Sequence, residues 1–134
     1  MLDELIARLE AATEGSRELD AEIWRVADPP ACKIADYQSR AFTGRDWTEE
    51  EKAEAVAARM KRLAPHFTTS LDAALTLVPE GCAFRLQKNL NGKYWVSMQR
   101  KFPDQELGFD IWVDAYGPTI VLALCIAALK ARAA

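Results

Sequence analysis

The sequence predicts an α+β fold, in which helices pack on both faces of a three-stranded antiparallel meander and the C-terminal helix is buried. Apolar and polar residues alternate in three segments between Phe84 and Val113, as expected for half-buried strands. Asn91-Gly92 lies between the first two segments and is the strongest short signal for a β-hairpin. An uninterrupted apolar run begins at Ile120, so the meander is followed by a helix that needs burial.

The length of the chain, 134 residues, suits one domain with a core of its own. We therefore expect a single domain over residues 1–134, with no internal repeat and no low-complexity segment. Its expected parts are a helical hairpin at 1–28, an insertion with one helix at 29–68 and a helix-β-β-β-helix core at 69–134.

Two short amphipathic helices form the predicted hairpin. Gly15 is expected to end the first helix in the left-handed conformation, and Ser16 to cap the second. Pro29-Pro30 ends the second helix, because proline has no amide to donate. The apolar stripes follow helical spacing, with Leu2, Leu5, Ile6 and Leu9 in the first helix and Leu19, Ile23 and Val26 in the second.

The predicted insertion has an irregular part, Ala31 to Asp46, and one helix. Thr48 and Glu51 form a capping box, in which the Thr48 hydroxyl accepts a hydrogen bond from the Glu51 amide. The helix is expected to end at Leu63, before Pro65. Its expected buried face consists of Ala53, Val56, Ala57, Met60 and Leu63.

The loop length of the hairpin follows from the requirement that one face be apolar. A two-residue loop would pair Leu86 with Ser97 and mix polar and apolar residues on both faces. A three-residue loop, 90–92, pairs Leu86 with Val96 and lets Gly92 supply the left-handed residue. We therefore predict the three-residue loop, which also pairs Phe84 with Met98 and Lys88 with Tyr94.

Two helices flank the predicted sheet. The first is capped by Thr69 or Ser70, and Gly117-Pro118 opens the second with proline in its first turn. The second helix is apolar around its whole circumference and is expected to lie across the apolar sheet face. The buried stripe of the first helix is expected at Leu71, Ala74, Leu75 and Val78, and the third strand adds Phe109, Ile111 and Val113 to the apolar face.

The opposite sheet face is the candidate binding site. Two hypotheses stay open for it: the tryptophans are covered by an N-terminal helix, or they are flat anchors for a partner, as in interface hot spots. Under the second hypothesis the site consists of Trp95, Trp112, Arg85, Gln87, Lys93, Asp110 and Asp114. Trp24 and Trp47 are expected to pack the helical layer only.

Neither catalysis nor a metal or cofactor site is indicated. His66 is the only histidine and lies outside any motif, and the three cysteines have no metal-ligand spacing. Asp110 and Asp114 share a strand face, where carboxylates are usually solvated. A net charge of −3 argues against nucleic acid, and no apolar run is long enough to span a membrane. The cysteine usage suits a reducing cytoplasm.

Three stretches resemble a known family. They are Glu4-Leu-Ile-Ala-Arg-Leu-Glu-Ala-Ala-Thr-Glu-Gly-Ser-Arg-Glu-Leu-Asp20, Thr69-Ser-Leu-Asp-Ala-Ala-Leu-Thr-Leu-Val-Pro-Glu-Gly81 and Pro118 to Ala131. Together they resemble small phage and prophage proteins with the phage ABA (alpha-beta-alpha) sandwich domain. The resemblance does not cover 31–67. It implies helices on both faces of a sheet and a phage protein acting in the bacterial cytoplasm, and it supplies no catalytic residues.

We therefore expect a non-enzymatic, phage- or prophage-encoded accessory protein that binds a host or phage protein. Inhibition of bacterial anti-phage defence is the role that this origin favours. The alternative is a small-ligand or nucleotide-binding protein, in which Arg85, Lys93 and the two strand tryptophans form a stacking and phosphate site.

Overall fold

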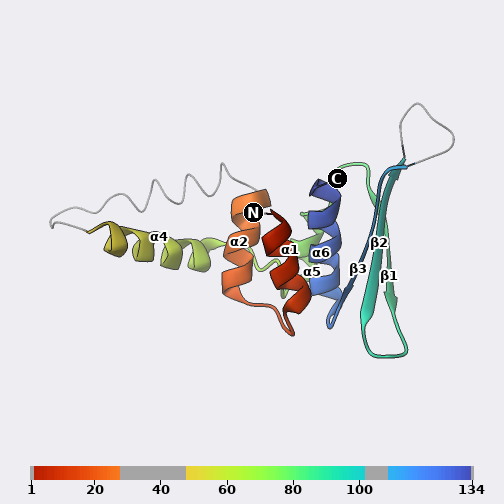
Figure 1. The fold of residues 1–134 in the computed structure, drawn as a ribbon, viewed down its shortest axis with the longest axis horizontal. Coiled ribbons are helices and arrows are strands. Elements are labelled where there is room, and N and C mark those ends of the chain that lie inside the picture. The colour runs from red at the N-terminus through yellow and green to blue at the C-terminus, as the bar shows by residue number, and fades with distance from the viewer. Residues whose placement is uncertain (1, 28–47, 102–108, 134) are drawn as a thin grey trace. The chain divides into compact units, whose positions relative to one another are not determined.

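The structure is a computed structural model, which describes residues 2–27, 48–101 and 109–133; at 101, 109 and 110 it describes the backbone alone. Figure 1 shows the fold. The described elements are α1 (Leu2–Ala11), α2 (Arg17–Ala27), α4 (Glu49–Leu63), α5 (Leu71–Leu75), β1 (Ala83–Lys88), β2 (Tyr94–Lys101), β3 (Phe109–Gly117) and α6 (Ile120–Ala133).

The chain forms two compact units. The first contains Met1–Ser16 and His66–Ala134, and the second contains Arg17–Pro65. The helices predicted as one hairpin fall in different units, since α1 belongs to the unit that contains the sheet, where it contacts α6, and α2 belongs with α4. The second unit therefore begins earlier than the insertion expected at 29–68. The irregular segment 31–46, Pro29-Pro30 and Trp47 lie outside the described residues.

The sheet is an antiparallel meander in the order β1-β2-β3, as predicted. Leu86 pairs with Val96, which confirms the register of the three-residue loop. The Asn89 amide donates to the Lys93 carbonyl at 2.7 Å, and the Gly92 amide donates to the Asn89 carbonyl at 3.1 Å. Gly92 has a φ of +84°, the left-handed conformation that the loop requires.

The apolar face of the sheet is covered by α6, as predicted (Figure 1). Every residue from Leu122 to Leu129 is buried, because the sheet lies on one side of α6 and α1 and α5 contact it elsewhere. The Leu122 amide donates to the Thr119 hydroxyl at 3.1 Å, so Thr119 is the cap. Pro118 thus precedes the cap, and its expected place in the first turn was wrong.

The helices of the sheet-containing unit lie on one side of the sheet in Figure 1. The α+β class, the meander and the buried last helix are confirmed, but none of the helices described in this unit forms a layer on the opposite face. The physical reason is that α1 has a narrow apolar stripe, Leu5, Ile6 and Leu9. The all-apolar α6 offers that stripe a better partner than a polar sheet face does.

The buried stripe of α5 differs from the prediction. Leu71 and Leu75 are exposed by 39% and 38%, whereas Ala74 and Leu77 are buried. The chain leaves the α-helix after Leu75 through hydrogen bonds between residues three apart, including Leu77 amide to Ala74 carbonyl at 3.0 Å. This tighter turn aligns positions i and i+3, so Leu77 rather than Val78 follows Ala74 toward the core.

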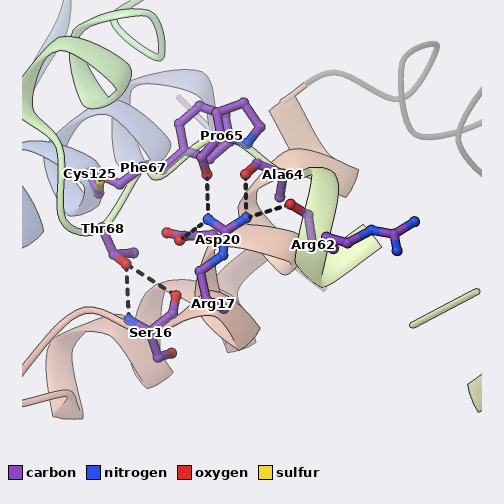
Figure 2. Close-up of polar contacts among 9 residues, drawn as sticks. All are labelled: Ser16, Arg17, Asp20, Arg62, Ala64, Pro65, Phe67, Thr68 and Cys125. Atoms are coloured by element: carbon purple, nitrogen blue, oxygen red, sulfur yellow. Dashed lines mark hydrogen bonds and ion pairs between the residues drawn. The ribbon is translucent and has the colours of Figure 1, made fainter. Parts of the chain in front are cut away.

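Gly15 is required for a close approach, and its predicted left-handed conformation was wrong because its φ is not positive. A Cβ at this position would lie 2.4 Å from the Thr68 carbonyl oxygen. The Ser16 amide donates to the Thr68 hydroxyl at 3.0 Å, and that hydroxyl donates to the Ser16 carbonyl at 3.2 Å (Figure 2). Gly15 and Thr68 thus join the two chain segments that form the sheet-containing unit.

The second unit pairs α2 with α4. The Thr48 hydroxyl accepts from the Glu51 amide at 3.1 Å, which confirms the predicted cap of α4. Of the expected buried face, only Met60 is buried, and Leu63 is 43% exposed. Trp24 is buried, as expected for packing in a helical layer.

Replacing Gly92 with valine tests the register of the hairpin. A Cβ at Gly92 would meet nothing within 4 Å, so the whole cost is backbone strain in a β-branched residue. We expect Gly92→Val to lower the free energy of unfolding by about 1–2 kcal/mol in urea titration. The control Gly92→Asn should lose much less, because asparagine tolerates this conformation. Equal stability of the valine variant and the parent would contradict the loop.

Candidate functional site: the aromatic face of the sheet

The aromatic face is the sheet face opposite α6, and the register arranges it in three rows. Arg85, Ser97 and Asp114 form the central row, with one residue from each strand. One flanking row contains Gln87, Trp95 and Tyr116, and the other contains Ala83, Gln99 and Trp112.

Aromatic rings are accessible on this face although they belong to well-formed strands. Trp112 is 59% exposed and Tyr116 is 56% exposed, and both belong to the edge strand β3. Trp95, on the central strand, is half-buried. Ser97 is buried although no helix of this unit covers it, so the larger side chains around it shield it from water.

Five of the seven predicted site residues lie in these rows, and Trp95 and Trp112 share the face as predicted. Lys93 is exposed and follows the hairpin loop directly, and its amide donates to the Asn91 side chain at 3.0 Å. Asp110 lies at an irregularity of β3, because Lys101 pairs with Phe109 and Arg100 pairs with Ile111. The prediction assumed that side chains alternate regularly between the two sheet faces from Asp110 to Asp114. This irregularity in the strand pairing interrupts that alternation.

Tyr116 is a residue of the face that the sequence reasoning missed. The alternation of Trp112 and Asp114 continues to Tyr116, so the signal was present. The prediction named residues of the third strand only as far as Asp114, whereas β3 continues to Gly117.

Charge is separated across the aromatic face. Arg85 belongs to one edge strand and Asp114 to the other, with Ser97 between them. Strands lie about 4.8 Å apart, so the two charged residues are roughly 10 Å apart along the sheet. Side-chain hydrogen bonds run along the strands, including Gln99 to Ser97 at 3.3 Å. The arrangement offers rings, amides and opposite charges for docking.

Within the described residues, no group of histidine, cysteine or carboxylate side chains could hold a metal ion. No helix in the described part of the chain is long and apolar enough to cross a membrane. No family model, curated protein or solved structure matches the chain.

A second polar cluster, in the unit of α2 and α4, was not predicted. Figure 2 shows the Arg17 guanidinium between the Asp20 carboxylate and the end of α4. It donates to Asp20 at 2.7 Å and to the carbonyl of Ala64 at 2.6 Å. It also donates to the carbonyls of Arg62, at 3.3 Å, and Pro65, at 3.4 Å. A cation at these carbonyls complements the helix dipole, so the cluster stabilises the pairing of the helices.

The spacing of Arg17 and Asp20 permits a pair along one helix, but the sequence does not indicate that Asp20 is buried. Asp20 is instead fully buried, and the carbonyls that share Arg17 are more than forty positions away along the chain. At the surface of the same unit, Glu18 pairs with Lys61, whose hydrogen bond lowers the pKa of Glu18.

Removal of the Asp20 carboxylate should destabilise the α2–α4 unit. Asp20→Ala leaves Arg17 without a buried counter-ion, and breaking such a pair costs about 3 kcal/mol. The exposed Glu18→Ala variant is the matched control on the same helix and should change stability far less. Denaturant unfolding monitored by the fluorescence of the tryptophans measures both. An Asp20→Ala variant as stable as the control would show that the cluster contributes nothing.

Proposed function

We propose that this chain is a phage- or prophage-encoded, non-enzymatic accessory protein that binds a host protein through its aromatic face and thereby inhibits anti-phage defence. The observation that supports binding is the exposure of Trp112 and Tyr116 on an ordered strand. The phage origin and the defence role follow from the resemblance of the sequence alone.

The packing of the sheet explains why these rings are available. The core needs only the opposite face, where Val96, Met98 and Ala115 contact the α6 side and are buried. The aromatic face is therefore not needed to close the core of this unit. Large rings that remain in water lose the free energy their burial would release, and binding a partner recovers it.

The type of partner follows from the chemistry of the face. Rings with amides and separated charges around them have the composition of protein–protein hot spots. Arg85 and Asp114 would fix the orientation of the partner, because each rejects a like charge. The alternative, a small-ligand or nucleotide-binding protein using the same face, is an outcome of the experiment that follows.

Capture from bacterial lysate with the purified chain as bait tests this function. Trp112→Ala and Trp95→Ala should each weaken binding of the captured protein by at least about 2 kcal/mol, measured by titration calorimetry. Leu90→Ala is the matched control, since Leu90 is exposed and apolar but lies at the hairpin tip, away from the face.

Thermal unfolding of the same variants separates binding from stability. Trp112→Ala should melt close to the parent because its ring is already largely in water. A partner that binds both tryptophan variants as tightly as Leu90→Ala would overturn the proposed function. Native mass spectrometry that finds a small molecule in place of a protein would favour the alternative.

A further inference from the structure

The aromatic face is complementary to itself. A two-fold axis in the plane of the face and parallel to β2 places β1 of a second copy over β3 of the first. Because the rows are fixed by the register, this operation determines which residues meet. Arg85 of the second copy then lies over Asp114 of the first, and the reverse pair forms at the same time.

The flanking rows match in size under the same operation. The exposed ring of Trp112 lies over Ala83 of the second copy, the smallest side chain of the face. The ring of Tyr116 lies over Gln87 of the second copy. Residues of β2, including Trp95 and Ser97, lie on the axis and meet their own copies.

The other in-plane two-fold axis, perpendicular to the strands through the central row, does not give this match. It places Arg85 over Arg85 and Asp114 over Asp114, and like charges in contact are destabilising. Charge therefore selects the axis along β2. Within one copy, β2 separates Arg85 from Asp114, so these two opposite charges lie far apart. In the dimer, each of them faces the opposite charge of the second copy.

We propose that a second copy of this chain occupies the aromatic face, in a weak two-fold dimer that the host partner must displace. The displacement rests on the proposed function, whereas the self-association stands without it. Three short strands can bury only on the order of a few hundred Å² per copy. This buried area is typical of a transient interface rather than a stable one. Lys93 lies on the same axis beyond Trp95, so it meets Lys93 of the second copy. The repulsion between these two positive charges weakens the interface further.

Charge exchange tests the dimer. Sedimentation equilibrium of the parent up to about 1 mM should show a monomer–dimer equilibrium. Arg85→Glu and Asp114→Arg should each raise the dimer Kd by about tenfold or more, because each places like charges in contact. The double variant Arg85→Glu/Asp114→Arg restores both opposite pairs and should return to within about threefold of the parent.

Lys88→Glu is the matched control, because it reverses an exposed charge of the same strand on the other face, where Lys88 lies near the Tyr94 ring. It should leave the dimer unchanged. A parent that stays monomeric overturns the proposal, as does a double variant no better than the single ones. A monomeric parent whose captured partner is lost in Trp112→Ala would overturn the dimer and leave the proposed function standing. A charge-dependent dimer, found together with a captured protein that binds Trp112→Ala as tightly as it binds the parent, would support the dimer and overturn the proposed function.

Discussion

The pairing of Leu86 with Val96 is the constraint on which the sheet-containing unit depends. Side chains alternate between the faces of a strand, so a slip of one residue would turn the faces of β2 over relative to those of β1. Trp95 and Ser97 would then face α6, and Val96 and Met98 would face water. The Gly92 turn holds the register by admitting a backbone conformation that other residues adopt with strain. The aromatic face exists because this short loop fixes the register.

The position of α6 explains why one sheet face is left for binding. Since α6 is apolar all round, it has to be surrounded, and the sheet, α1 and α5 each contact it. The short helices α1 and α5 therefore lie on the α6 side of the sheet and do not cover the opposite face. The residues that face away from α6 are polar or aromatic, as the strands require if that face meets water or a partner. Core and candidate site are thus two consequences of one alternation.

The elements that the sequence predicted correctly are those whose causes are local. Asn91-Gly92 and the consistency of one apolar face determined the hairpin loop, and the capping box determined the start of α4. The same alternation placed Trp95 and Trp112 on one face. The missing parts depend on contacts between distant segments.

Two examples show what local patterns lack. Gly15 was assigned a left-handed turn, but its role is to let Thr68 approach, and that neighbour is not visible in the sequence. Arg17 donates hydrogen bonds to carbonyl groups at the end of α4, and no periodicity of α2 indicates these contacts. The division of the N-terminal helices between two units has the same origin.

Proton contacts across the hairpin test the register most directly. In an antiparallel pair without mutual hydrogen bonds the two Cα atoms lie about 4.5 Å apart, and their α-protons give a strong nuclear Overhauser effect. The structure predicts this signal between Leu86 and Val96. A strong signal between Gln87 and Val96 in its place would show a two-residue loop, because Gln87 and Val96 are the pair without mutual hydrogen bonds in that register. Both the core face and the aromatic face would then be wrong.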